Sequence, residues 1–453
     1  MSIKIARLRF RWSDKQRMTG EIQGRAMKSL RVLFAFALLF SASPGMPAAA
    51  PAGPHEVELT WMSIANWYFK LGDVRIVMDG YITRLPGPPF FFAPLGFPAD
   101  QFAFTQGPST VDVASVTRVR DALSANGQLD YLLAGHSHWD HTWDTPTWSK
   151  LTGAPIIGGI SSCFQAVTQD VSPSQCAVIN GGERIDLGNG VTIRVVRFNH
   201  SGNASNPIQH FARELSAPPV PDPATGGLRA GVGEDYPNGG GGRAFLFTID
   251  NPGGPVSFFV QNSASAFDLD KDIIVDGVNY GAPLANLAAA MADAGLTRVD
   301  AWIGTGGLAV AQLIVPVIHP KVYIPNHWDG LFNSFWAGMP FPYKDDTLNG
   351  YLDAQGIALM PQHQYFDTYR LDARGVTMKP NHDVKQKLGF PDVQPFASAM
   401  LDAVTNVAST AYGDHCGESA SDSPWARSMF AHITDRSRRY FVFAPRRSVS
   451  YGF

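Results

Sequence analysis

The chain has few cysteines and almost no excess of charge of either sign. It contains 3 cysteines among 453 residues, and none stands in a metal-binding spacing, which excludes a zinc site built from cysteine. The 36 Lys and Arg residues nearly balance the 39 Asp and Glu residues, so the charge predicts no nucleic-acid partner. The length allows two or three domains, and we expect one large domain over residues 55–395.

The apolar segment near the N-terminus is too short for a comfortable transmembrane helix. A basic start at 27–31 precedes apolar Val32–Phe40, and Ala48–Ala50 offers small residues for cleavage. This order is typical of a secretory signal peptide. We therefore expect residues 1–50 to form an N-terminal extension with a cleavable signal peptide starting at Met27, and the mature protein to be periplasmic or secreted. The alternative is an uncleaved membrane anchor.

The cysteines and the C-terminal residues carry weaker signals. Cys163 and Cys176 are close enough in sequence to form a disulfide in an exported protein, which leaves Cys416 over. We expect one amphipathic helix over residues 396–411, followed by a disordered, arginine-rich tail that ends at residue 453. A solvated tail is our first interpretation, and contact with an anionic membrane is the alternative.

The most informative feature is the run His136-Ser137-His138-Trp139-Asp140-His141. It follows the apolar residues 131–134, which predict a buried strand ending at Gly135. Alternating imidazoles and a carboxylate after a strand can point into one concave site. This donor set suits Zn²⁺ and, with lower selectivity, Mn or Fe. The alternative is a histidine-rich surface turn without a ligand role.

This motif resembles that of the metallo-β-lactamase superfamily, and the likeness extends over about residues 56–372. The resemblance implies two neighbouring metal sites. A first ion would be bound by His136, His138 and His200, and a second by Asp140, His141 and His327. His210 is the alternative to His200. Asn262 would be a further ligand, at the position where the family usually has a bridging aspartate. Because its amide is neutral, the zinc centre would hold one or two ions. Asp268 and Asp270 are nearby substitutes that we consider less suitable. Orienting residues would be Asp79 and Asp144, the latter with a helix N-terminal role as the alternative.

The predicted elements agree with a layered α/β protein. Strands are expected over 74–78 and 191–197, with a hairpin of 244–249 and 256–260 around the turn at Asn251–Gly254. Helices are expected over 115–126, with Ser115 as N-cap, and over 286–294. Strands followed by ligands occur twice along the chain. The resemblance implies the α/β class known as the four-layer αββα metallo-β-lactamase sandwich, with the metals at one edge.

The resemblance also implies an activity, which is metal-dependent hydrolysis. A bound metal would lower the pKa of a water molecule, and the resulting hydroxide would attack an ester, lactone, phosphodiester or amide. Asp140 would orient that water and carry its proton. Aromatic side chains in two loops predict a lipophilic, lipid-like small substrate, and packing under the loops is the alternative: Phe90, Phe91, Phe332 and Trp336. The lactonase and phospholipase D-like branch is the favoured one. A degenerate, non-catalytic binding protein is the competing hypothesis, and residues 218–242 are expected to be a lid or a surface excursion.

Overall fold

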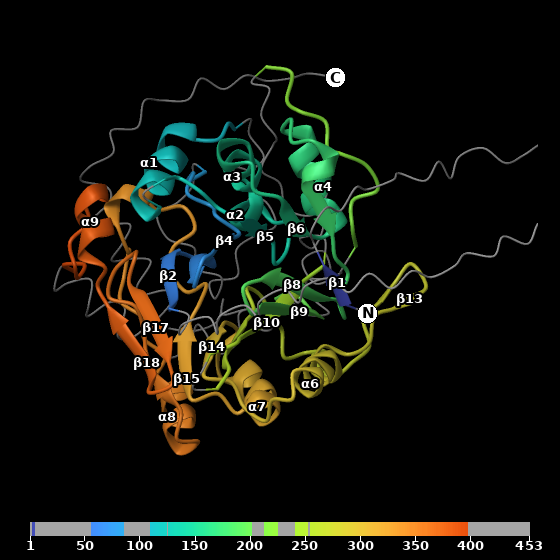
Figure 1. The fold of residues 1–453 in the computed structure, drawn as a ribbon, viewed down its shortest axis with the longest axis vertical. Coiled ribbons are helices and arrows are strands. Elements are labelled where there is room, and N and C mark those ends of the chain that lie inside the picture. Colours follow the sequence, from blue (N-terminus) through green and yellow to red (C-terminus); the bar gives the residue numbers. More distant parts are fainter. Residues whose placement is uncertain are drawn as a thin grey trace, which may run out of the picture.

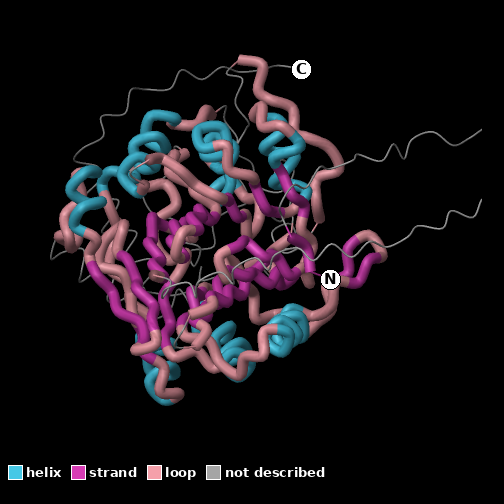
Figure 2. The backbone as a smooth tube through the Cα atoms, viewed as in Figure 1, coloured by secondary structure: helices cyan, strands magenta, loops and turns pink. Residues whose placement is uncertain are grey.

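Two mixed β-sheets lie face to face and are covered on their outer faces by helices (Figures 1 and 2). The structure is a computed structural model and describes residues 2–4, 56–85, 109–124, 126–201, 213–224, 241–251 and 254–396. Within these residues, the observed layers confirm the predicted αββα sandwich. No helix in the described part of the chain is long and apolar enough to cross a membrane.

Each sheet combines an antiparallel part with a parallel part. One sheet has the order β18 (Gly375–Lys379), β17 (Thr368–Asp372), β2 (Val57–Ser63), β3 (Asn66–Leu71), β4 (Val74–Met78), β5 (Tyr131–Leu133), β6 (Ile156–Gly158), β7 (Cys176–Val178). The other has the order β1 (Ser2–Lys4), β8 (Arg184–Gly188), β9 (Val191–Arg197), β10 (Arg243–Ile249), β11 (Val256–Val260), β14 (Ala301–Gly304), β15 (Val322–Pro325), β16 (Ala358–Leu359). The strand pattern that occurs twice in the sequence therefore corresponds to two similar sheets. A separate small ribbon pairs β12 (Ile274–Val275) with β13 (Val278–Asn279).

The helices form the two outer layers (Figure 1). On the β2–β7 side lie α1 (Val113–Leu123), α2 (Trp139–Thr142), α3 (Thr145–Thr152) and α4 (Ile160–Thr168). On the other side lie α6 (Pro283–Asp293), α7 (Gly307–Ile318) and α8 (Asp346–Ala354). The short elements are α9 (His382–Leu388), η3 (Pro173–Gln175) and η5 (Phe335–Ala337).

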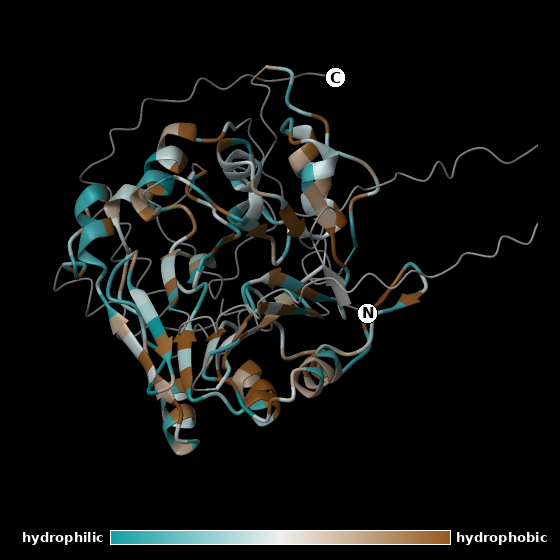
Figure 3. Cartoon of the chain, viewed as in Figure 1, coloured by the Kyte–Doolittle hydropathy of each residue, from teal (hydrophilic) through white to brown (hydrophobic). Residues whose placement is uncertain are grey.

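Alternating side chains of single strands enter two different apolar cores. On β10, Phe245 and Phe247 belong to the core between the sheets, whereas Leu246 packs in the core under α6, α7 and α8. Phe69 of β3 meets Phe247 with ring centroids 5.5 Å apart, which joins the two sheets. Because both faces are covered, these strands are mainly apolar, and Figure 3 shows brown segments in many strands of the two sheets.

Most predicted elements are present, with shifted helix starts. Strands 74–78 and 191–197 coincide with β4 and β9. Helix α1 begins two residues before the expected start, because the side chain of Asp112 and not that of Ser115 caps it. Helix α6 begins at Pro283, since the first helical turn tolerates proline. The expected signal peptide and the residues of the expected C-terminal helix from 397 onward lie outside the described residues.

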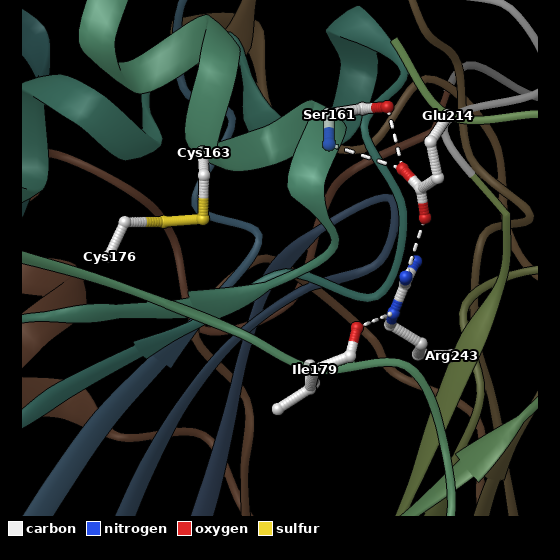
Figure 4. The surroundings of a disulfide bond; sticks show 6 residues. All are labelled: Ser161, Cys163, Cys176, Ile179, Glu214 and Arg243. Carbon is white, nitrogen blue, oxygen red and sulfur yellow. Dashed lines mark hydrogen bonds and ion pairs between the residues drawn. A yellow bond between two sulfur atoms is a disulfide. The ribbon is translucent and has the colours of Figure 1, made fainter. Parts of the chain in front are cut away.

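The predicted disulfide is present, and a buried charge cluster lies near it (Figure 4). Cys163 on α4 bonds to Cys176 at the start of β7, with Cα atoms 5.7 Å apart. At the start of the same helix, Oγ of Ser161 donates to the carboxylate of Glu214 over 2.6 Å. Arg243, which is 1% exposed, donates from its guanidinium to the other oxygen of Glu214 over 2.6 Å. Residues 213–224 are therefore fastened to α4 and to the start of β10.

Candidate metal centre

The predicted ligands lie at the ends of strands from both sheets. The motif follows β5 directly, and its last ligands stand on the single turn of α2, which His138 precedes. His200 follows β9 after a short turn, and His327 follows β15. The apolar strands thus bring together residues that are far apart in the sequence.

Three imidazoles form what we call the first half-site: His136, His138 and His200. The ring centroids of His136 and His138 lie 4.8 Å apart. The ring centroid of His200 lies 4.6 Å from that of His136 and 4.5 Å from that of His138. Nε2 of His136 is 3.2 Å from Nδ1 of His138. All three rings are buried, and the three residues offer ligand atoms within 4.8 Å of one another.

Asp140, His141 and His327 form the second half-site. Nε2 of His327 is 3.1 Å from Oδ2 of Asp140 and 3.2 Å from Nε2 of His141. The remaining distance, from Nε2 of His141 to Oδ2 of Asp140, is 3.3 Å. Nitrogen and oxygen ligands at about 2.0–2.1 Å from a tetrahedral ion lie about 3.3 Å from one another. The three donor atoms therefore fit a small divalent metal.

Asp79 connects the motif with the second half-site. It follows β4 in the left-handed backbone region, at φ 61°. Its Oδ1 accepts a hydrogen bond from the backbone N–H of Gly135 over 2.9 Å, and its Oδ2 lies 2.8 Å from Nδ1 of His141. A carboxylate at that nitrogen keeps the proton on Nδ1 and leaves Nε2 free to bind a metal. Asp79 therefore has the contacts of an orienting residue.

Asn262 was predicted as a ligand, and the structure places its amide elsewhere. Its Nδ2 donates to Oδ2 of Asp79 over 2.7 Å, and its Oδ1 lies 3.0 Å from Nδ1 of His136. The amide thus contacts Asp79, which is not a ligand, and the ring nitrogen of His136 that does not face the first half-site. Asp268 does not replace it, because its carboxylate accepts a hydrogen bond from Asn199 over 2.6 Å. Asp270 is exposed.

The side chain of Asp144 binds the backbone of Ile82 and Thr83 and makes no hydrogen bond to the helix that follows it. It stands at the N-cap position of α3, where its side chain makes no capping hydrogen bond. Its Oδ2 instead accepts from the backbone N–H groups of Ile82 and Thr83, each over 2.6 Å. Burial raises the pKa of this carboxyl to about 6. Asp144 therefore stands at the helix N-terminus, as the alternative predicted, but its side chain holds the segment that follows Asp79.

The charges of the centre follow from burial and from the two carboxylates. Burial, together with the neighbouring rings, lowers the pKa values of His136 and His200 well below the usual histidine value. Burial opposes ionisation of Asp140, but His141 and His327 hold its pKa well below its usual range. Burial also lowers the pKa of His141, yet Asp140 and Asp79 raise it to about 10. A cation is therefore favoured in the second half-site, either as a proton or as a metal.

The predicted substrate-binding aromatics separate into different groups. Phe332 stacks on Trp139 of the motif, with centroids 5.0 Å apart. Trp336 instead packs under α1: it donates to Oγ of Ser115 over 3.0 Å, and the guanidinium of Arg118 lies 4.3 Å from its ring centroid. These contacts give Trp336 a packing role and argue against the predicted substrate contact. The remaining predicted residues lie outside the described ones: Phe90, Phe91 and His210.

The sequence did not indicate the residues that fix the turns around His200 and His327. The backbone N–H of His327 donates to the carbonyl of Ile64 over 3.0 Å, and the N–H of Ile64 donates to Asp329 over 2.7 Å. Near His200, the N–H of Ser201 donates to Oγ of Ser263 over 2.9 Å. A sequence signal exists for Asp329 alone of these residues: it is a carboxylate two residues after the ligand His327.

Comparisons with known proteins place this centre in context. No family model matches the chain. A UPF0173 metal-dependent hydrolase of Pyrobaculum islandicum is 34% identical over 151 residues, which are 33% of this chain and 54% of the relative. A UPF0173 metal-dependent hydrolase of Dinoroseobacter shibae is 28% identical over 148 residues, or 32% and 50% of the two chains. The chain thus spans about half the length of these curated relatives.

Solved structures with a similar fold include Igni18, a metallo hydrolase from Ignicoccus hospitalis. It is 14% identical with a TM-score of 0.39, and the match covers 70% of this chain and 99% of that one. An isothiocyanate hydrolase from Delia radicum gut bacteria is 11% identical with a TM-score of 0.39, covering 69% and 98%. The αββα layers and the His-x-His-x-Asp-His centre at the strand ends are the features that the resemblance to the metallo-β-lactamase superfamily predicts.

Proposed function

We propose that this protein is a metal-dependent hydrolase whose active site is the pair of half-sites. The observation that carries the proposal is the triangle of donor atoms from Asp140, His141 and His327, with sides of 3.1, 3.2 and 3.3 Å. Its spacing suits a divalent ion, and three further imidazoles lie beside it. The curated relatives that match a third of the chain carry the name metal-dependent hydrolase, which supports the same activity here.

The donor set favours zinc, with manganese or iron as alternatives, because imidazole and carboxylate groups bind all three. When bound, the metal would supply an activated water and polarise the oxygen of the scissile group. Asp140 stays ionised beside His141 and His327, so its carboxylate can orient a water molecule and accept a proton. Asp79 lies 2.8 Å from Nδ1 of His141, so Nε2 is the ring nitrogen that would bind the metal.

We propose a small lipophilic substrate, such as an ester, lactone, phosphodiester or amide with an apolar group. An apolar cluster lies beside the motif and includes Trp139, which stands between two ligands, together with Phe332, Tyr81 and Leu85. Val111 packs against the same cluster. This supports the lactonase and phospholipase D-like branch as our favoured one.

We also propose that the protein acts outside the cytoplasm, in the periplasm or as a secreted enzyme. The disulfide between Cys163 and Cys176 supports this location, because such bonds persist in oxidising compartments. The predicted signal peptide supports it independently. Contact of the basic tail with a membrane stays a secondary hypothesis.

The test combines metal analysis with hydrolysis assays on the full chain, purified without chelator. We expect bound metal and hydrolysis of at least one member of a panel of lipophilic esters, lactones and phosphodiesters. His138→Ala should lower the rate by about a hundredfold or more, whereas His382→Ala should leave it unchanged, because His382 is an exposed partner of Asp392. Full activity of the His138→Ala protein would refute the site. Bound metal without any hydrolysis would favour the non-catalytic binding protein.

A further inference from the structure

A single amide, that of Asn262, lies between the two half-sites. It follows β11 and is 2% exposed. A Cβ atom added at Gly135 would lie 2.1 Å from Nδ2 of Asn262, so the amide fills the space against the backbone that leads into the motif. Its two polar atoms reach in different directions, toward Asp79 and toward His136. The orientation of this amide therefore matters to both half-sites.

The chemistry of its neighbours decides which way the amide faces. The carboxylate of Asp79 can only accept, so the NH₂ group of Asn262 must lie toward it, at 2.7 Å. The carbonyl oxygen then faces Nδ1 of His136 at 3.0 Å and can only accept. His136 consequently carries its proton on Nδ1, and its lone pair lies on Nε2. That atom is the one 3.2 Å from Nδ1 of His138, in the first half-site.

We infer that Asn262 is a positioning residue that fixes the tautomer of His136, and that the two half-sites, which share no carboxylate among the described residues, bind divalent metal with unequal affinity. The second half-site has the carboxylate of Asp140 as a ligand and that of Asp79 behind His141. The first half-site has three imidazoles and a neutral amide behind His136. Because attraction to a divalent ion increases with negative charge on and behind the ligands, the second half-site binds the tighter ion. This inference rests on the proposed function only in requiring that the centre binds metal.

A titration of the metal-free full chain with Co²⁺ tests the order of binding. Calorimetry should show one tight ion and a second ion bound at least about tenfold more weakly, and electron paramagnetic resonance should show no exchange coupling between them. His327→Ala should remove the tight ion, whereas the matched variant His200→Ala should retain it. Two coupled ions of equal affinity, or loss of the tight ion in His200→Ala alone, would overturn the inference.

Two substitutions of Asn262 test the positioning role itself. In the wild-type protein, ¹⁵N spectra should show His136 protonated on Nδ1, and Asn262→Ala should give a mixture of both tautomers. Asn262→Asp would place a carboxylate oxygen close to Asp79, so its metal-free form should be less stable, and it should bind the second Co²⁺ ion at least about tenfold more tightly. An unchanged His136 signal in Asn262→Ala would refute the role. Unequal affinity of the two half-sites for Co²⁺ without any hydrolysis would refute the proposed function alone. Equal affinity of the two half-sites together with hydrolysis would refute this inference alone.

Discussion

Replacing Asp79 by asparagine should weaken metal binding although Asp79 is not a ligand. Three donors converge on its two oxygens: the N–H of Gly135 at 2.9 Å, Nδ1 of His141 at 2.8 Å and Nδ2 of Asn262 at 2.7 Å. An asparagine offers one acceptor oxygen and one NH₂ group, so one donor must face another donor. If the NH₂ group faces His141, that ring moves its proton to Nε2, which can then no longer bind metal.

The expected size follows from the same contacts. Loss of a carboxylate behind a metal-binding histidine lowers metal affinity by about 10- to 100-fold, which corresponds to about 1.4–2.8 kcal/mol. Competition with a chromophoric zinc chelator measures this change directly. Asp144→Asn is the matched control, because Asp144 is also a buried aspartate but accepts its hydrogen bonds from Ile82 and Thr83. A folded Asp79→Asn protein with wild-type zinc affinity would refute the assignment of Asp79 as an orienting residue.

Three further predictions concern stability. Replacing both Cys163 and Cys176 by serine should lower the free energy of unfolding by about 3 kcal/mol in urea denaturation, because their separation of 13 residues closes a short loop; an equal stability in reducing and oxidising buffer would contradict this. The pKa of Asp144 is raised from 3.8 to about 6, so the stability that its protonated form contributes is present below about pH 4 and lost as the pH rises through about 6. Asp144→Asn should therefore gain up to about 3 kcal/mol relative to wild type between those pH values, and a constant difference would refute the sign. Glu214→Gln should destabilise the protein by about 3 kcal/mol, since the buried guanidinium of Arg243 would lose the charge of this carboxylate; an unchanged urea midpoint would speak against that pairing.

The ligands were readable from the sequence because their signals are local. A histidine-rich hexapeptide directly after an apolar strand needs no knowledge of the rest of the fold, and His200 and His327 each follow a recognisable strand. The role of Asn262 was not readable, since it depends on a hydrogen bond to Asp79, 183 residues earlier in the chain. A residue type at a family position does not reveal which way its amide faces. That direction is decided by the acceptor beside it.

The aromatic residues show the same limit for substrate contacts. Phe332 and Trp336 stand four residues apart in one loop after His327, and both fitted a pocket wall equally well. In the structure Phe332 stacks on Trp139, whereas Trp336 lies under the guanidinium of Arg118 and against Phe390. The sequence shows that the loop is rich in aromatic residues. Which ring packs against the fold depends on the position of α1, whose Ser115 and Arg118 contact Trp336.

Three of the left-handed non-glycine residues are a ligand or lie beside one. Asp79, His327 and Ile64 all adopt left-handed φ values, of 61°, 59° and 46°, which cost about 1–2 kcal/mol for each non-glycine residue. Ile64 is β-branched, so its conformation is the least expected of the three. Its N–H donates to Asp329 and its carbonyl accepts from the N–H of His327, so the strained residues hold one another in place. The hydrogen bonds that fix these residues thereby also fix the spacing of the donor atoms.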